Sequence, residues 1–362
     1  MTITGLERAL AYLNMEKTDK IPIWHQSSDI SRKLVGATFP EFAFDAKKIA
    51  AGHIEYVRKY KPDISGVNTD MWWMLEPMGA QIEILDHIIQ PKPSPNKDRP
   101  DPEIYDRLEY RSPFEGPRAK VVLEGMKMVF DKVGNEVLLR HGYYGPAGNL
   151  AVLFGIPEVM RDAVLFPDVM MRAVKRVMLP WTVDFITGMC EAVKPNLHNI
   201  CWAMTPFDYD LMPRELWDRI AEVELEAFLK IRDNVGKDLP VTTHFCGNRP
   251  ALDFAMERFG KYINELQFWW PGSDYALETA VRKYGNRKPL MAGIDHTRTM
   301  ITGSPADVDR MVKQAIEIAD ERCSFALGPG CDMAYITPDE NLYALVEARD
   351  KYGTHPLGHA RG

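Results

Sequence analysis

Residues Val241–Cys246 read VTTHFC, a short run of the kind that forms a buried strand. The segments on either side of this strand indicate the fold. Along the chain, short apolar segments alternate with longer amphipathic ones, which favours βα units around a parallel sheet. Eight strands are predicted on this pattern: Ile21–Trp24, Asp63–Asn68, Glu136–His141, Leu197–Met204, Val241–Cys246, Ile263–Phe268, Lys288–Ile294 and Ser324–Gly328. Eight strands that alternate with helices predict an α/β fold of the (β/α)8 TIM-barrel class.

Helix signals support the same fold. A strong apolar period covers Arg214–Asn234. Pro at the first helical position predicts two further helices, Pro305–Asp320 capped by Ser304 and Pro338–Lys351 capped by Thr337. These helices follow predicted strands, as the barrel requires.

One barrel domain is expected to span residues 1–362, with an N-terminal extension and a surface excursion near residues 90–120. The segment Gln90–Asp101 is rich in Pro, Lys and Asp, which is typical of a surface loop. With 362 residues and 46% hydrophobic side chains, the chain can bury a large core.

Composition excludes several classes of function. The net charge of -7 argues against a nucleic-acid partner and against an anionic membrane surface. No apolar run approaches the roughly 20 residues of a membrane span. The N-terminus, Met1–Ala11, has no apolar signal core, so we expect a cytoplasmic protein. Five cysteines, an odd number, favour free or metal-bound thiols over a disulfide framework.

A candidate metal site lies at one rim of the predicted barrel. Side chains alternate along a strand, so His244 and Cys246 point the same way. Cys331 lies just past the eighth predicted strand, whose end faces the same mouth. Two thiolates and an imidazole favour zinc, and three protein ligands leave the fourth position open. The alternative is a core histidine with two buried free cysteines.

Several motifs resemble the uroporphyrinogen decarboxylase superfamily, and within it the zinc-dependent, corrinoid-linked methyltransferases. The motifs are His244-Phe245-Cys246-Gly247-Asn248, Ala292-Gly293-Ile294-Asp295, Gly328-Pro329-Gly330-Cys331, Thr337-Pro338-Asp339-Glu340-Asn341-Leu342 and Gly145-Pro146-Ala147-Gly148-Asn149-Leu150. The resemblance covers most of the chain and is strongest from about residue 240 to 350. It implies a (β/α)8 barrel, and zinc ligands at His244, Cys246 and Cys331.

The same resemblance implies the reaction and its partners. A methyl group would pass from a methylated small molecule to cob(I)alamin, with the cobalamin carried by a separate corrinoid protein. Transfer from methylcobalamin to an acceptor such as a thiol or tetrahydrofolate is the alternative direction. A decarboxylase-like lyase is disfavoured, because the arginines that bind its substrate in that family are missing from the segment after the first strand, Trp24–Asp29, and the next arginine is Arg32. A barrel that holds zinc without turnover is the non-enzymatic alternative.

Aromatic residues near the predicted mouth favour an aromatic methyl ether as the donor. The substrate contacts expected there are Trp24, His25, Tyr143, Trp202 and Phe207, although aromatic residues at strand ends also fill cores. Two residues after the seventh strand are candidates for catalysis. Asp295 could orient a ligand or only cap a helix, and His296 could carry a proton or be an ordinary loop histidine.

Overall fold

Seven parallel strands form one curved sheet in the computed structural model, which describes residues 3–25, 28–193, 199–203, 213–320 and 323–354. Neighbouring strands in the sheet follow the order β1-β4-β5-β6-β7-β8-β9. Their bounds are β1 Ile64–Gly66, β4 Leu138–Tyr144, β5 Asn199–Ala203, β6 Val241–Phe245, β7 Glu265–Phe268, β8 Leu290–Ile294 and β9 Phe325–Pro329. Each lies within or beside a predicted strand.

The first predicted strand, Ile21–Trp24, closes the barrel through single bridge residues. Ile23 pairs in parallel with Leu327 of β9, and Trp24 pairs in parallel with Ile64 of β1. The Trp24 N–H donates to the Leu327 carbonyl at 2.8 Å. This segment therefore joins the two edges of the seven-stranded sheet, and the (β/α)8 TIM-barrel prediction is confirmed.

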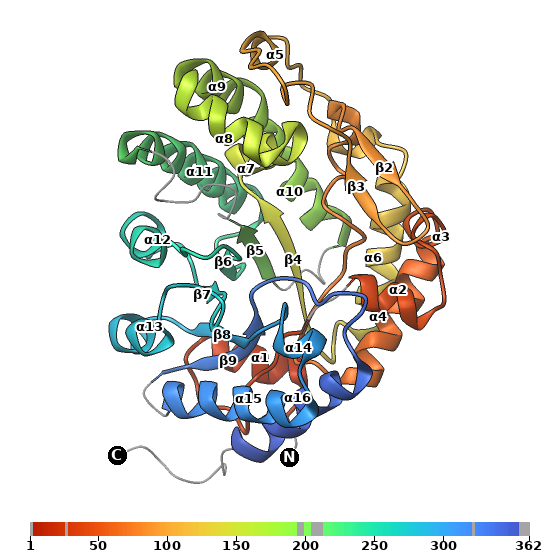
Figure 1. Ribbon diagram of the computed structural model, residues 1–362, viewed down its shortest axis with the longest axis vertical. Helices are drawn as coiled ribbons and strands as arrows, with labels where there is room; N and C mark the ends of the chain where they lie inside the picture. Colours follow the sequence, from red (N-terminus) through yellow and green to blue (C-terminus); the bar gives the residue numbers. More distant parts are fainter. Residues whose placement is uncertain (1–2, 26–27, 194–198, 204–212, 321–322, 355–362) are drawn as a thin grey trace.

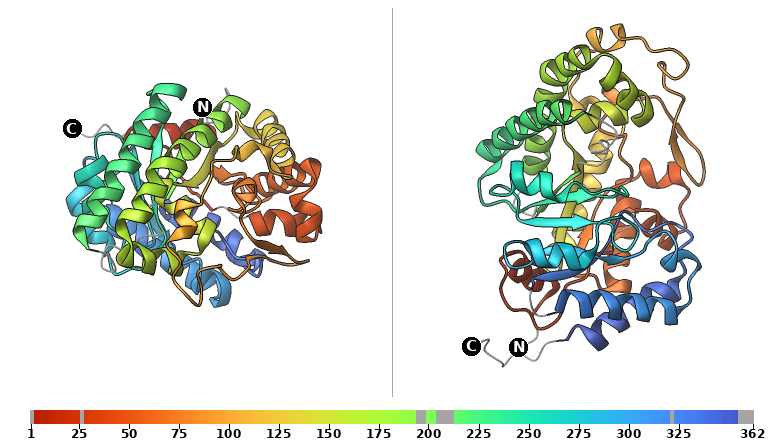
Figure 2. Two further views of the ribbon diagram at one scale, coloured as in Figure 1. Left: turned by 90° about the horizontal axis from the view of Figure 1, so that it is seen from above. Right: turned by 60° about the vertical axis from the view of Figure 1, so that its left-hand side comes forward.

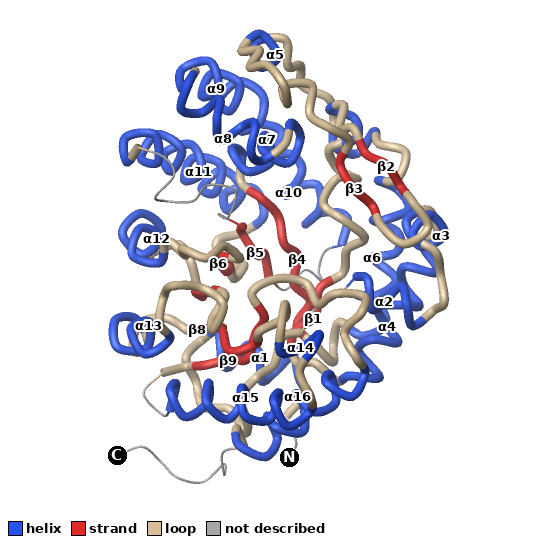
Figure 3. The backbone as a smooth tube through the Cα atoms, in the orientation of Figure 1, coloured by secondary structure: helices blue, strands red, loops and turns tan. Residues whose placement is uncertain are grey.

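Helices surround the sheet on its outer side (Figure 1, Figure 2 and Figure 3). Their bounds are α1 Gly5–Leu13, α2 Ser28–Leu34, α3 Phe39–Ala43, α4 Ala46–Tyr60, α5 Glu103–Asp106, α6 Ala119–Val133, α7 Pro146–Phe154, α8 Ile156–Leu165, α9 Pro167–Ala173, α10 Leu179–Val193, α11 Arg214–Val235, α12 Leu252–Phe259, α13 Leu277–Tyr284, α14 Thr299–Thr302, α15 Pro305–Ala319 and α16 Asp339–Tyr352. Among the described helices, none is both long and apolar enough to cross a membrane.

One of the two helix caps expected from sequence is present. Ser304 caps α15 as expected: its Oγ accepts from the Asp307 N–H at 3.3 Å, and the Asp307 carboxylate accepts from the Ser304 N–H at 2.8 Å. Thr337 does not cap α16, so that prediction is wrong. Pro338 takes the cap position, and the buried Thr337 hydroxyl has no hydrogen-bond partner in the described part of the chain.

An unpredicted hairpin leads into the segment expected to form a surface excursion, and that segment is tied to the helical layer. β2 (Ile82–Ile84) and β3 (Ile89–Pro91) pair antiparallel. Further along, Asp162 on α8 accepts hydrogen bonds from the Asn96 amide at 3.0 Å and the Tyr105 hydroxyl at 2.8 Å. These buried hydrogen bonds hold the Pro-rich stretch against the molecule.

A buried polar layer inside the barrel shows which face of each strand points inward. Arg140 of β4 forms an ion pair with Glu265 of β7, although β5 and β6 lie between these two strands in the sheet. Thr242 of β6 donates to Glu265 at 2.5 Å, and Tyr12 of α1 donates to it at 2.9 Å. Contacts between non-adjacent strands must cross the barrel interior. Arg140, Thr242 and Glu265 therefore define the inward face.

Candidate metal centre

Three side chains converge at the carboxyl ends of the strands. The ligand atoms of His244, Cys246 and Cys331 all lie within 4.8 Å of one another. Among the residues that the structure describes, this is the one group of three or more His, Cys, Asp or Glu side chains placed to hold a metal ion. Residues 85 positions apart in sequence meet here because β6 and β9 end at the same mouth.

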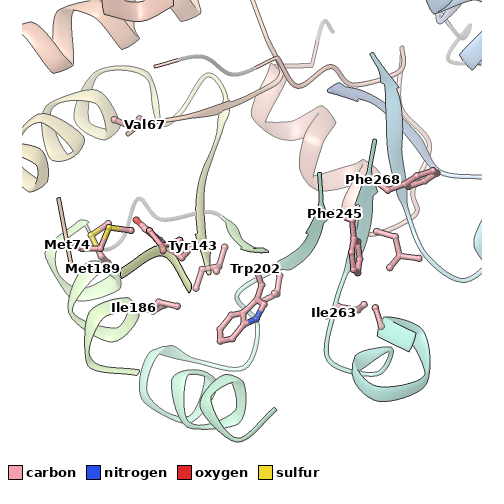
Figure 4. Close-up of a cluster of buried hydrophobic side chains, with 14 of the residues drawn as sticks. Val67, Met74, Tyr143, Ile186, Met189, Trp202, Phe245, Ile263 and Phe268 are labelled. Atoms are coloured by element: carbon pink, nitrogen blue, oxygen red, sulfur yellow. The ribbon is translucent and has the colours of Figure 1, made fainter. Parts of the chain in front are cut away.

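Strand alternation places the two ligands from β6. Thr242 points inward, so His244 and Cys246 follow on the same face with a period of two. Phe245 points the other way, into the layer between sheet and helices, where Figure 4 shows it near Phe268. The His244 ring also meets Trp24, with ring centroids 6.3 Å apart.

The close approach of Trp269 explains why a glycine, Gly330, precedes Cys331. A Cβ at this position would overlap the ring of Trp269, which follows β7. The same tryptophan packs against His296, with ring centroids 5.3 Å apart. The glycine therefore lets an aromatic wall stand beside the third candidate ligand.

Hydrogen bonds already link these donor groups. Burial opposes the charged form of His244, but hydrogen bonds to Cys201 and Cys331 outweigh it and raise the pKa of His244 to about 10. The pKa of Cys331 is raised well above its usual value by its hydrogen bond to Cys246 and by burial. The set consists of one imidazole and two sulfurs, which are the donors that zinc prefers. The residues present therefore fit a zinc ion.

A family model agrees with this geometry over nearly the whole chain. The uroporphyrinogen decarboxylase (URO-D) model matches residues 4–352. The chain belongs to the uroporphyrinogen decarboxylase family.

Similar proteins in this family include methyltransferases. The chain is 25% identical to the methylcobamide:CoM methyltransferase MtaA of Methanosarcina barkeri over 352 residues, covering 95% of this chain and 97% of that protein. It is 25% identical to MtbA of Methanosarcina acetivorans, a methylcobamide:CoM methyltransferase, over 96% of this chain and 98% of that protein. The solved structure of a methyltransferase from Methanosarcina mazei has the same fold, with a TM-score of 0.77, 22% identity, and coverage of 97% and 99%.

Asp295 lies at the mouth of the barrel, but its carboxylate forms hydrogen bonds within its own turn. Its oxygens accept from the hydroxyls of Thr297 at 2.9 Å and Thr299 at 3.2 Å, and from three backbone N–H groups at 3.3 Å. Burial of Asp295 opposes ionisation, but these hydrogen bonds hold its pKa below the usual value. Asp295 therefore holds the turn before α14, whose cap position is Arg298, and a catalytic role stays a prediction.

His296 lies beside the candidate metal ligands. It packs on Trp269, and the charge of His244 acts on it. Burial is the main reason that the pKa of His296 falls to about 4. Its imidazole is therefore neutral at physiological pH and could accept a proton only weakly.

Trp24 and His25 point to opposite sides of the barrel wall. Trp24 lies inside, between Arg140, whose guanidinium is 5.1 Å from the ring centroid, and His244. His25 is fully buried, and its Nδ1 donates to the Tyr56 hydroxyl of α4 at 2.8 Å while that hydroxyl donates to the His25 carbonyl at 2.7 Å. The structure brings Trp24 to the metal ligands and does not bring His25 there.

Tyr143 and Trp202 also lie on the outer face of their strands. Figure 4 shows both among buried hydrophobic side chains. Tyr143 packs on Phe185 of α10 at 4.8 Å between centroids, and Trp202 packs on Phe228 of α11 at 5.7 Å. The structure does not place these two residues with the metal ligands. Phe207 lies outside the described residues.

Three residues beside the site are not among the predicted contacts. Tyr144 shares the inward face of β4 with Arg140, and its pKa is raised well above the usual value by burial and then by Cys246 and Cys331. Cys201 hydrogen-bonds with His244, and Asp332 directly follows Cys331. Arg140, a charged residue within a predicted strand, is the signal that could have shown which face of that strand points inward. Tyr144, four residues later, lies on the same face.

Proposed function

We propose that this chain is a zinc-dependent, corrinoid-linked methyltransferase. The observation that carries the proposal is the convergence of His244, Cys246 and Cys331 within 4.8 Å at the barrel mouth. The named activity of the MtaA and MtbA relatives, which align over almost their full length, supports the same class of reaction.

His244, Cys246 and Cys331 would hold the zinc ion. When bound, zinc supplies Lewis-acid activation of the heteroatom that bears or accepts the methyl group, and keeps the thiols deprotonated. The chain's own residues then position the substrate and keep the site dry. Trp24 forms an apolar floor beside His244, and Trp269 and Tyr144 stand beside the cysteine ligands.

We infer that the methyl donor is a neutral aromatic methyl ether. In this reaction the bond from oxygen to the methyl carbon breaks, and cob(I)alamin supplies the electron pair for the new cobalt–carbon bond. A phenolate leaves and takes a proton from solvent. Aromatic walls suit such a donor. Burial first, and then the charge of Asp29, raise the pKa of Asp332 beside Cys331, so the surroundings of Cys331 disfavour a further negative charge.

The corrinoid is a substrate here, carried by a separate protein that docks at the mouth. The metal ligands lie at the carboxyl ends of the strands, the face on which active sites of this barrel class are built. The partner must present its cobalt to this entrance for the methyl group to move directly.

The opposite direction, from a methylcobamide to a thiol, is the second candidate. The names of the MtaA and MtbA relatives favour it, since both are methylcobamide:CoM methyltransferases. The same three ligands would serve, with the thiol sulfur in place of the ether oxygen.

Decarboxylation of a polycarboxylate gains no support from the site, although the chain belongs to the decarboxylase family. Arg32, the first arginine after the Trp24 segment, is 1% exposed. Its guanidinium donates to the carbonyls of Ala37 at 3.1 Å and His87 at 3.2 Å. Arg32 is therefore a buried structural residue that is not placed to bind a substrate carboxylate.

An assay in both directions tests the proposal. The purified chain is mixed with cob(I)alamin and guaiacol or veratrole, and separately with methylcobalamin and a small thiol, while the cobalamin spectrum is followed. We expect methylcobalamin to form in the first mixture. Demethylation of methylcobalamin in the second mixture, with no reaction in the first, would instead support the second candidate function. Inactivity of the zinc-loaded chain in both mixtures would contradict a methyltransferase.

A further inference from the structure

Gln267 of β7 links the two strands that carry the candidate metal ligands. It is fully buried, and its inward direction follows from Glu265, two residues earlier on the same face. In the sheet, Gln267 is the register partner of His244 on β6. Its Nε2 donates a hydrogen bond to the carbonyl of Pro329, two residues before Cys331.

The chemistry of Pro329 fixes the orientation of the amide. A carbonyl oxygen only accepts, so the atom of Gln267 that contacts it must be the NH2 group. The amide oxygen, Oε1, then points the other way. It is buried and has no hydrogen-bond partner among the residues that the structure describes. A buried acceptor without a partner is unfavourable, so its retention calls for an explanation.

The candidate ligand His244 supplies that explanation. An imidazole that binds a metal through one nitrogen carries a proton on the other, and this N–H requires an acceptor that fixes the ring. Register partners on adjacent strands are about 4.8 Å apart, within reach of a glutamine side chain. Cys201 also hydrogen-bonds with His244, but sulfur is a weak acceptor beside an amide oxygen.

We propose that Gln267 is a positioning residue of the metal centre. Through Nε2 it holds the end of β9, which carries Cys331, and through Oε1 it offers the acceptor for the second ring nitrogen of metal-bound His244. It touches neither the substrate nor the reacting atoms. The inference rests on the metal centre of the proposed function.

Metal affinity separates this role from simple filling of the barrel interior. Gln267→Met keeps the length of the side chain but removes both hydrogen bonds, and Gln267→Asn keeps an amide that is too short to reach Pro329. Asn341→Leu is the matched control. Asn341 is also a buried amide, donating to the carbonyls of Met300 at 3.1 Å and Gly303 at 2.8 Å, but it joins α16 to the α14 turn.

Zinc affinity is measured by chelator competition, and the Co²⁺-substituted proteins are compared by their thiolate and ligand-field absorption. We expect both Gln267 variants to bind zinc about 10–100-fold more weakly than the wild type and to show a shifted Co²⁺ spectrum. Asn341→Leu should lower thermal stability and leave both readouts unchanged.

Wild-type affinity and an unchanged Co²⁺ spectrum in either folded Gln267 variant would overturn the inference, as would an equal loss in Asn341→Leu. These outcomes leave the proposed function intact, because they compare variants of a zinc-binding protein. Failure of the wild type itself to bind zinc would instead contradict the proposed function.

Discussion

At the residue scale, the direction of single side chains decides the composition of the site. A period of two along β6 predicts that His244 and Cys246 share a face, and the structure brings their ligand atoms together with that of Cys331. The same period could not decide between Tyr143 and Tyr144. Both neighbours are aromatic, and the face that points inward depends on the ion pair from Arg140 across the barrel to Glu265.

Replacing Tyr144 should weaken binding of an aromatic donor. Loss of one aromatic contact costs about 0.5–1.5 kcal/mol, so we expect Tyr144→Ala to raise the KM about two- to tenfold. Tyr143→Phe is the control, because the buried Tyr143 hydroxyl has no hydrogen-bond partner among the described residues. Steady-state kinetics with guaiacol checks both variants. An unchanged KM in Tyr144→Ala would remove Tyr144 from the substrate site.

At the scale of elements, long helices and strands follow from sequence, and short or mutually braced segments do not. The pattern over Arg214–Asn234 predicts α11, which spans Arg214–Val235. The hairpin of β2 and β3 escapes prediction because each strand has only three residues. Thr337 preceded a Pro at the expected first helical position, but α16 begins one residue later.

One such brace fixes the turn between β4 and α7. Glu224 of α11 accepts from the Ala147 N–H at 3.1 Å and from the Trp202 indole at 2.8 Å. A side chain at Gly145 would overlap this carboxylate, which explains the glycine of the Gly145-Pro146 motif. The brace therefore ties the outer layer to the turn that follows Tyr144.

Glu224→Gln should break that brace. Two N–H donors need two acceptor oxygens, and glutamine has only one, so we expect the free energy of unfolding to fall by about 1–3 kcal/mol. Glu226→Gln is the matched control on the same helix, since its exposed ion pair with Lys230 contributes under about 1 kcal/mol. Urea unfolding at pH 7.5 compares them. Equal losses in the two variants would contradict the brace.

At the scale of the whole molecule, the alternation of strands and helices predicts the barrel and its mouth. Closure of the barrel could not be predicted in detail, because Ile21–Trp24 joins the edges through bridge residues instead of a regular strand. The interior also buries histidines without charge partners. Burial lowers the pKa of His25 to about 3 and that of His53 to about 4.

Those two histidines should make the fold sensitive to acid. Their folded pKa values lie below the unfolded value of about 6.5, so the unfolded chain binds more protons below that pH. Stability is full above about pH 6.5 and declines as the pH falls toward 4. We expect each histidine to remove about 2 kcal/mol by pH 5.

Urea unfolding between pH 7.5 and pH 5 tests this expectation. His53→Gln should show a shallower decline than the wild type, and His87→Gln, at an exposed position of the hairpin, should decline as the wild type does. A wild-type curve that is flat over this range would contradict the assignment.

The central claim is that His244, Cys246 and Cys331 hold a zinc ion that serves methyl transfer, and one comparison tests it most directly. Zinc content and methylcobalamin formation from cob(I)alamin and the aromatic ether are measured on the wild type, Cys331→Ala and Cys323→Ala. Cys323 is the control, because its sulfur donates to the Ala319 carbonyl at 3.5 Å, at the end of α15. We predict about one zinc per chain and activity in the wild type and in Cys323→Ala, with both lost in Cys331→Ala. Full zinc content and full activity in Cys331→Ala would contradict the claim.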